Sequence, residues 1–323
     1  MIWKRGIGRL GVAIACVIAF TMCLLSYIIH PDEILPIQYG LWLDSPDSWN
    51  INPFLSWLIN TLLIGGITFL LYIINKNYNF IRTTEPALPV LFLIMTASSS
   101  WITQGLNTST LLCLVNVVCM AVIFDAYSTE NATQQMFILG MALGIGAMFQ
   151  YAFLPMACVY IIWALFMRVL RFKEVVAFIA GLCCPYWISL GLGWLHFSNF
   201  HLPSPVSLFT TSNDHSDILF LLLEIGVAII LGVVAALPNS MKLYAGNSRV
   251  NSMNLCVSIL GLVCLICILI DYENIPAYVM TLFMATAAQL ANVCALWRVK
   301  YLWTVTVVPC VIYILFFIGN LFL

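Results

Sequence analysis

The chain has 323 residues, of which 63% are hydrophobic and 8% are charged, and its formal net charge at pH 7 is −1. A soluble domain is typically about 45–50% apolar and about 25% charged, so this composition excludes a soluble globular protein and predicts an integral membrane protein with the lipid bilayer as its partner. The balanced charge and the lack of a basic patch also exclude a protein that binds nucleic acid.

The first apolar run, at about residues 9–29, is long enough to cross a bilayer, since a spanning helix needs roughly 20 mainly apolar residues. It follows a basic start, as the core of a signal peptide would. However, it is longer than such a core, and no small-residue cleavage site follows it. We therefore predict an uncleaved first span, which ends at His30 and Pro31.

Similar apolar runs recur to the end of the chain and predict an all-α polytopic transmembrane helix bundle. The predicted spans number about eleven and lie at about residues 9–29, 52–74, 87–103, 109–125, 136–150, 153–167, 175–196, 217–237, 253–271, 276–296 and 301–322. No polar segment between them is longer than about 22 residues. Residues 1–323 are therefore predicted to form a single integral membrane domain without a soluble domain.

The least regular part of this pattern is the apolar run from Met136 to Met167. It is too long for one spanning helix and barely long enough for two. Gln150 and Pro155 mark the expected break, because a proline inside a helix removes a hydrogen bond and clashes with the preceding turn. The run fits either two short spans or a re-entrant pair. Gln150 is also a candidate for a substrate or ion path.

Charge gives an independent test of these spans, because lysine and arginine are enriched in the cytoplasmic loops of membrane proteins. With the N-terminus inside, every basic residue of the chain falls in a segment predicted to face the cytoplasm. These residues are Lys4, Arg5, Arg9, Lys76, Arg82, Arg168, Arg171, Lys173, Lys242, Arg249, Arg298 and Lys300. The distribution predicts an N-in, C-out orientation and requires an even number of crossings between Arg82 and Arg168.

The opposite face is predicted to carry most of the acidic residues, mainly in outer loops at about 30–51 and 197–216. All four histidines also lie on this face or at its edge. Asp214, His215 and Asp217 follow one another closely, and histidine with carboxylate oxygens suits a divalent metal such as Mg²⁺ or Mn²⁺. The alternative is that these loops are acidic simply because the basic residues stay inside.

One ionisable residue lies deep in a predicted span. Glu224 is about 10 Å below Asp217 on the same helical face, and no lysine or arginine of the chain lies at its depth. Because a charge inside a bilayer is costly, we expect the carboxyl to be protonated or to face a wet cavity. It is either a proton or cation site or a neutral carboxyl that is hydrogen-bonded inside the bundle.

Other polar and small residues in the spans have structural interpretations. Gln289 and Asn292 lie three residues apart on one helical face and are expected to form interhelical hydrogen bonds. Gly140, Gly144 and Gly146 form a small-residue face, which predicts close packing against another helix.

The tetrapeptide His30-Pro31-Asp32-Glu33 directly follows the first span, at the height where a lipid-linked donor presents its phosphate and sugar. A carboxylate there suits a general base for an acceptor hydroxyl, or a ligand that holds a divalent metal against a phosphate. The tetrapeptide and its position resemble the first outer loop of GT-C type glycosyltransferases, which use lipid-linked phosphosugars. The resemblance implies Asp32 or Glu33 as the catalytic acid or base, with His30 beside it, and a lipid-linked sugar as substrate. The chain departs from such enzymes because its predicted outer face has no arginine or lysine to hold a phosphate.

A second resemblance covers about residues 50–190. The segment NINPFLSWLINTLL, the turn marked by Pro155, the basic loop around Arg171 and the pair Pro185-Tyr186 are similar to an uncharacterised family of multi-pass inner-membrane proteins from Bacteroidota bacteria. The resemblance implies a bacterial inner membrane as the location, which would make the outer face periplasmic. It implies no particular chemistry.

Three classes of function follow from these observations. The chain is a transferase acting on lipid-linked sugars, a transporter or channel that uses Glu224 and Gln150, or a non-catalytic membrane subunit of a cell-envelope assembly. We place the transferase narrowly first among the specific functions, although the lack of outer basic residues counts against it. The sequence shows no inverted repeat of the kind that secondary transporters often carry, which counts against the second class.

Overall fold

The computed structural model describes residues 9–29, 40–49, 51–81, 86–196, 198, 200, 219–243, 248–271, 274–296 and 302–321. Within these ranges the chain forms α-helices and two short 3-10 turns, and no β-strand. The prediction of an all-α fold is therefore confirmed.

The helices lie close to where the apolar runs predict them. In chain order they are α1 (Arg9–Ile29), α2 (Pro53–Tyr78), α3 (Ala87–Ser98), α4 (Ser100–Thr103), α5 (Thr108–Asp125), α6 (Thr133–Phe149), α7 (Met156–Phe166), α8 (Phe172–Gly191), α9 (Leu219–Leu243), α10 (Ser248–Ile270), α11 (Ile275–Leu296) and α12 (Leu302–Leu321). The 3-10 turns are η2 (Pro46–Ser48) and η3 (Tyr151–Phe153). Apart from the four-residue α4, each α-helix overlaps one predicted span.

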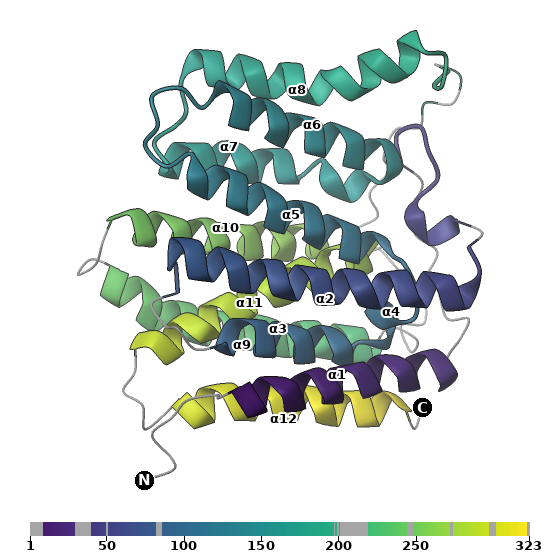
Figure 1. The fold of residues 1–323 in the computed structure, drawn as a ribbon, viewed down its shortest axis with the longest axis vertical. Helices are drawn as coiled ribbons and strands as arrows, with labels where there is room; N and C mark the ends of the chain where they lie inside the picture. The colour runs from purple at the N-terminus through teal and green to yellow at the C-terminus, as the bar shows by residue number, and fades with distance from the viewer. Residues whose placement is uncertain are drawn as a thin grey trace.

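Eight of the described helices are long and apolar enough to cross a membrane, namely α1, α2, α5, α8, α9, α10, α11 and α12. Helices α3, α6 and α7 are shorter, so the helices fit a multi-pass membrane protein while the number of eleven spans stays a prediction. Figure 1 shows the helices running roughly side by side, with their ends at two opposite faces. We refer to the face where α2 begins and α12 ends as the predicted outer end, and to the opposite face as the predicted inner end.

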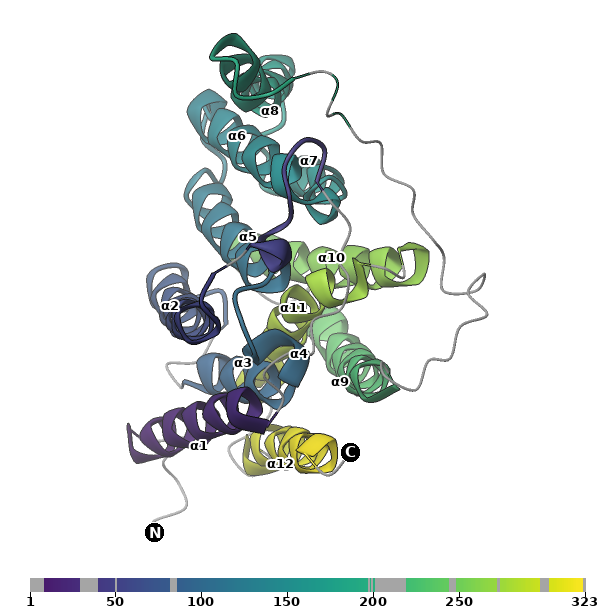
Figure 2. The same cartoon turned by 90° about the vertical axis from the view of Figure 1, so that its right-hand side faces the viewer.

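Helix α11 lies at the centre of the bundle. Its side chains from Ile275 to Cys294 are all buried, and it contacts α3, α5, α9, α10 and α12. Figure 2 shows it among these helices. Its alanines allow the neighbouring helices to approach closely, which explains why so many of them pack against one central helix.

The structure divides one predicted span into two helices. Residues 87–103 are predicted as a single crossing, but the chain leaves the helix at Ser99, with φ −89° and ψ 110°, and resumes as α4. Ser98 Oγ donates a hydrogen bond to the Met95 carbonyl at 2.8 Å. Such hydrogen bonds from a side chain to the backbone compete with the hydrogen bonds of the helix. Hydropathy does not detect them, so the break is not predicted.

The break predicted within residues 136–167 is confirmed. Helix α6 ends before Gln150, which is extended with φ −156° and ψ 134°, and α7 begins after Pro155. Helices α6 and α7 form a hairpin, because the residues before α6 and after α7 lie together. The Ser128 N–H donates to the Met167 carbonyl at 3.0 Å. Two short spans and a re-entrant pair both fit this hairpin.

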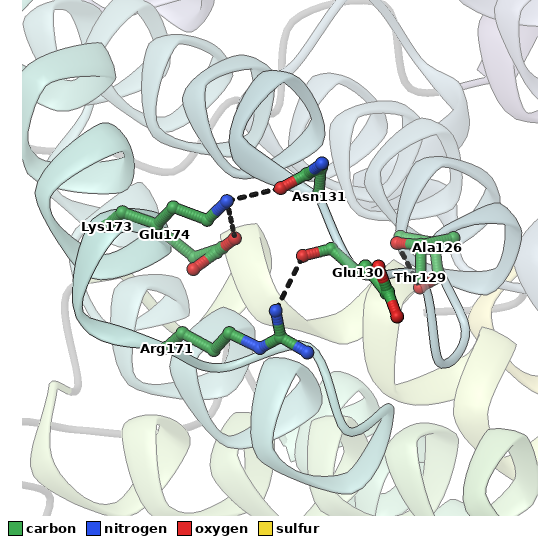
Figure 3. Close-up of polar contacts among 7 residues, drawn as sticks. All are labelled: Ala126, Thr129, Glu130, Asn131, Arg171, Lys173 and Glu174. Atoms are coloured by element: carbon green, nitrogen blue, oxygen red, sulfur yellow. Dashed lines mark hydrogen bonds and ion pairs between the residues drawn. The ribbon is translucent and has the colours of Figure 1, made fainter.

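Figure 3 shows the polar contacts at this end of the hairpin. Arg171 donates to the Glu130 carbonyl at 2.8 Å, and Lys173 contacts the Asn131 side chain and lies 3.8 Å from the Glu174 carboxylate. The basic connection between α7 and α8 therefore lies against the connection between α5 and α6. Both segments are predicted to face the cytoplasm.

Arg249, at the start of α10, belongs to the same end. Its guanidinium lies 5.9 Å and 5.6 Å from the ring centroids of Tyr78 and Tyr127, and it donates to the Phe124 carbonyl at 3.3 Å. The ends of α2, α5 and α10 therefore meet, as the predicted orientation requires. Which side of the membrane this end faces stays a prediction.

Helices α6 and α8 pack with their backbones in contact. A Cβ atom added to Gly140 would overlap the Phe178 carbonyl oxygen, and one added to Gly181 would overlap the Phe137 carbonyl oxygen. A Cβ atom on Gly144 would lie 2.5 Å from a carbonyl oxygen of α8. The predicted close packing against another helix is therefore confirmed for Gly140 and Gly144, whereas Gly146 faces the Phe153 ring of η3.

The segment 40–49, within the first predicted outer loop, folds onto the end of α6. The Leu43 N–H donates to the Met148 carbonyl at 3.0 Å, and the Leu41 N–H donates to the Ala147 carbonyl at 3.3 Å. The last carbonyls of a helix have no hydrogen-bond donor within the helix. The segment 40–49 provides backbone donors for two of these carbonyls in α6.

Asp47 joins the same segment to the start of α5. It accepts hydrogen bonds from the Thr108 backbone N–H at 3.3 Å and from the Thr108 hydroxyl. Asn107 accepts a further bond from the Thr110 N–H at 2.9 Å, so two side chains cap this helix. Burial raises the pKa of the Asp47 carboxyl above its ordinary value, and the bonds from Thr108 lower it in part.

Replacing Asp47 with asparagine is expected to change how stability depends on pH. A carboxyl whose pKa is raised on folding adds stability below its unfolded pKa and loses it as the pH rises through the folded pKa. The wild type should therefore lose unfolding free energy relative to Asp47→Asn as the pH rises from about 4. Thermal unfolding in detergent at a series of pH values measures this. Asp44→Asn, at an exposed carboxyl of the same segment, is the control, and parallel pH profiles for wild type and Asp47→Asn would contradict the prediction.

Candidate functional site

Most of the residues predicted to form a site lie outside the described residues. They are the candidate catalytic residues His30, Asp32 and Glu33 and the candidate metal ligands Asp214, His215 and Asp217. Within the part of the chain that the structure describes, no group of three or more histidine, cysteine, aspartate and glutamate side chains is arranged to hold a metal ion. The transferase site and its Mg²⁺ or Mn²⁺ ion therefore stay predictions.

Gln150 is described, and it lies at the break between α6 and η3. It is buried, and its amide nitrogen donates to the Asn274 side-chain oxygen at 2.5 Å. Asn274 in turn donates to both carboxylate oxygens of Asp271, at 3.1 Å and 2.9 Å. Gln150 thus belongs to a polar chain between α6 and the start of α11.

Glu224 lies in the second turn of α9 and is 1% exposed. The Ser99 hydroxyl, at the break between α3 and α4, lies beside its carboxyl. Tyr313 of α12 donates its hydroxyl to the Glu224 backbone carbonyl at 3.1 Å. Among the described residues, no lysine, arginine or histidine forms an ion pair with this carboxyl.

Glu224 Oε2 and Ser99 Oγ are close enough to affect each other, but neither atom makes a hydrogen bond of ordinary geometry among the described residues. Buried polar atoms are nearly always paired, because an unpaired one loses its hydration without compensation. A proton or a small cation that arrives between α9 and the α3–α4 break would give both oxygens a partner. The site is therefore suited to bind one.

Two other buried polar side chains near the break, Asn60 and Asn107, have hydrogen-bond partners. Asn60 accepts from the Thr110 hydroxyl at 2.7 Å and donates to the Ile102 carbonyl at 2.6 Å. Asn107 donates to the same carbonyl at 2.7 Å. This network holds the turn between α4 and α5, so its role is structural. Glu224 and Ser99 differ in this respect from Asn60 and Asn107, whereas the amide nitrogen of Gln104, at the end of α4, also has no hydrogen-bond partner among the described residues.

The interhelical hydrogen bonds predicted for α11 are confirmed. Gln289 donates to the Ser258 hydroxyl at 2.7 Å, and Asn292 donates to the Asn254 side-chain oxygen at 2.6 Å. Both bonds join α11 to α10. These side chains hold the central helix in register and have partners of their own, so they do not belong to the Glu224 site.

Among the described residues, no hydrogen-bond network joins Gln150 to Glu224, although both are candidates for an ion path. Gln150 bonds toward Asn274, whereas Glu224 lies beside Ser99 and Tyr313. Neither Ser99 nor Tyr313 is among the site residues predicted from the sequence. The run Ser98-Ser99-Ser100 inside an apolar segment is the signal that indicates a break, and Tyr313 has no comparable signal.

The fold and the buried carboxyl define a helical, multi-pass membrane protein with a polar site inside the bundle. Comparison with protein-family models, with curated proteins and with solved structures found no match for this chain. The resemblances to GT-C glycosyltransferases and to inner-membrane proteins of Bacteroidota therefore stay predictions. Function has to be argued from the site itself.

Proposed function

We propose that this protein moves a proton or a small cation across the bilayer, and that the Glu224 carboxyl is the group that binds it. The observation that carries the proposal is a carboxyl that is almost completely buried, adjoins an interrupted helix and has no cation as a partner among the described residues. We place this function above the transferase because its central residue lies within the described part of the chain.

The energetics of a buried carboxyl support this role. An isolated carboxylate in a low-dielectric interior is strongly disfavoured, so the group must carry a proton or pair with a cation. Binding and release of that ion are then coupled to a change in the surroundings of the carboxyl. A group of this kind is suited to carry charge through a membrane.

The interrupted helix supports the same function. In many transporters, discontinuous helices bring irregular backbone next to an ion or substrate site within the membrane. Here Ser99 is the residue that leaves helical geometry, and its hydroxyl lies beside Glu224. The proposed site therefore consists of Glu224 and Ser99, and it does not include Gln150.

The test is a flux measurement on wild-type protein in lipid vesicles that enclose a pH-sensitive or cation-sensitive dye. An imposed gradient of H⁺, Na⁺ or K⁺ is expected to decay faster with the protein than without it. Rates equal to those of protein-free vesicles for all three ions would overturn the proposal.

A transferase that acts on lipid-linked sugars at the periplasmic face of a bacterial inner membrane is the second candidate function. One observation favours it. The Trp42 ring packs on the Phe200 ring with a centroid distance of 4.7 Å, so described residues of the two predicted outer loops come together. A site shared by Asp32 and Glu33 with residues of the second loop is compatible with this contact.

Replacing Asp32 with asparagine together with Glu33→Gln is expected to stop sugar transfer if this second function is correct. Loss of a general base typically lowers a rate by about 10²- to 10⁴-fold. The measurement is the profile of cell-surface glycans and lipid-linked precursors at equal protein level. Asp44→Asn, which removes an exposed acid of the same predicted loop, is the control. An unchanged profile in the double variant would remove the transferase from consideration.

A non-catalytic subunit of a cell-envelope assembly is the third class, and it requires neither site. It would be favoured by stable co-purification of a partner protein, together with unchanged phenotypes for the Glu224 and the Asp32–Glu33 variants. Loss of activity in either variant would count against it.

A further inference from the structure

A groove of about 770 Å³ lies between α1, α2 and α3. Helices α1 and α2 each pack against α3, and the groove runs between them with α3 as its floor. Its walls include Cys16 and Phe20 from α1, Gly65 and Phe69 from α2, and Pro89 from α3. A volume of this size lies within the range of about 300–1,000 Å³ that is usual for small-molecule sites.

The groove faces the surroundings of the bundle rather than its core. Phe20, Phe69 and Tyr72 line it, and each is largely exposed. In a helix bundle with this composition, exposed aromatic and aliphatic side chains of this kind face lipid tails. Whatever enters the groove therefore enters from the hydrocarbon core of the bilayer.

The groove is closed toward the predicted outer end. Trp57 donates its indole N–H to the Cys23 carbonyl at 3.1 Å, and its ring packs on the Tyr27 ring at 5.3 Å. The lining residues farthest from this closure are Val12 and Tyr72, near the start of α1 and the end of α2. A ligand in the groove therefore extends from the middle of the bundle toward the predicted inner end.

The length of the groove matches one leaflet. Its lining on α1 runs from Val12 to Cys23, which corresponds to about 16 Å at 1.5 Å per residue. Half of the hydrocarbon core of a typical bilayer is about 15 Å. A chain that spans one leaflet fits this length, whereas a long isoprenoid chain exceeds it.

Gly65 adds an independent observation. An added Cβ atom at Gly65 would meet nothing within 4 Å, so no helix packing requires a glycine there. Glycine is a poor helix former, yet this one lies in the middle of α2 and lines the groove. Its effect on the structure is to keep the groove wide.

We propose that the groove between α1, α2 and α3 binds one acyl chain of a membrane phospholipid from the leaflet at the predicted inner end. The apolar lining, the closed outer end, the one-leaflet length and the glycine that keeps the groove open support this occupant. The proposal is independent of the role of Glu224.

The test compares Gly65→Leu with Gly66→Leu. Both glycines lie in α2, both leave space for a side chain, and only Gly65 lines the groove. Each protein is placed in vesicles that contain a phospholipid with a photoreactive group at the end of one acyl chain, and cross-linked peptides are identified by mass spectrometry. Wild type and Gly66→Leu are expected to cross-link in α1 or α3. Gly65→Leu should cross-link about tenfold less, equivalent to losing the burial of roughly two methylene groups.

Equal cross-linking in Gly65→Leu and wild type would overturn the proposal. Selective capture of a polyprenyl phosphate in place of the phospholipid, in a competition between the two, would also overturn it. Thermal unfolding in detergent checks that both variants fold. Should Gly65→Leu fail to fold, Cys16→Phe fills the same groove from α1 and is expected to show the same loss.

Discussion

Replacing Glu224 with glutamine is expected to reduce ion flux to the rate of protein-free vesicles. Glutamine keeps the size of the side chain, but it neither binds and releases a proton near neutral pH nor carries the negative charge that attracts a cation. No other described acid lies beside this break, so no neighbouring carboxyl can replace Glu224 in binding the ion. The measurement is dye-reported flux in vesicles that contain equal amounts of folded wild type and variant.

Glu174→Gln is the matched control for this experiment. Glu174 is as deeply buried as Glu224, at 0% exposed, but it lies at the predicted inner end beside Lys173. Its replacement is expected to leave flux unchanged. Wild-type flux in Glu224→Gln, or an equal loss in both variants, would contradict the role assigned to Glu224.

Replacing Gly181 with leucine is expected to separate α8 from α6. The Cβ atom of any residue at this position would overlap the backbone carbonyl of Phe137, and a backbone cannot move aside as a flexible side chain can. Overpacking typically costs about 1–3 kcal/mol and occasionally more, and an overlap with backbone places this substitution toward the upper end. Since α6 is the main contact of α8, which lies at the edge of the bundle in Figure 1, the contact of Tyr186 with the Trp42 ring is the main further support that the described residues give this helix. Thermal unfolding and size-exclusion chromatography in detergent measure the loss.

Gly191→Leu provides the comparison within the same helix. An added Cβ atom at Gly191 meets nothing within 4 Å, so this variant should unfold at the wild-type temperature. Similar melting temperatures for Gly181→Leu and wild type would show that the two backbones do not approach as closely as described.

The positions of the helices could be predicted because hydrophobic length is a local property. About 20 apolar residues are needed for a span, and four helices, α1, α5, α11 and α12, fall within one residue of their predicted bounds. The other long helices overlap their predicted spans but begin or end about three to six residues away from the predicted bounds. The break at Gln150 and Pro155 could also be predicted, because proline acts on its own helix. The break at Ser99 could not, because a few serines barely lower the average hydropathy of the segment, while the Ser98 hydroxyl bonds to the backbone and competes with the helix.

The candidate site could be predicted only in part. Glu224 is conspicuous because a carboxylate is rare inside a span. Its neighbour Ser99 lies far away in the sequence, and no local pattern links the two. Gln150 is equally conspicuous, yet its partner is Asn274 and not the Glu224 site. A single sequence indicates which polar residues lie in the membrane, but the packing of helices decides which of them meet.

The complete burial of α11 has a consequence for how the protein is assembled. This helix is the least hydrophobic of the eight that are long enough to span a membrane, and its neighbours are protein rather than lipid along nearly its whole length. Lipid alone therefore retains it weakly after insertion. Helices α3, α5, α9 and α10 precede α11 in the chain and contact it, so we expect α11 to be held stably in the membrane only after these four helices have been inserted.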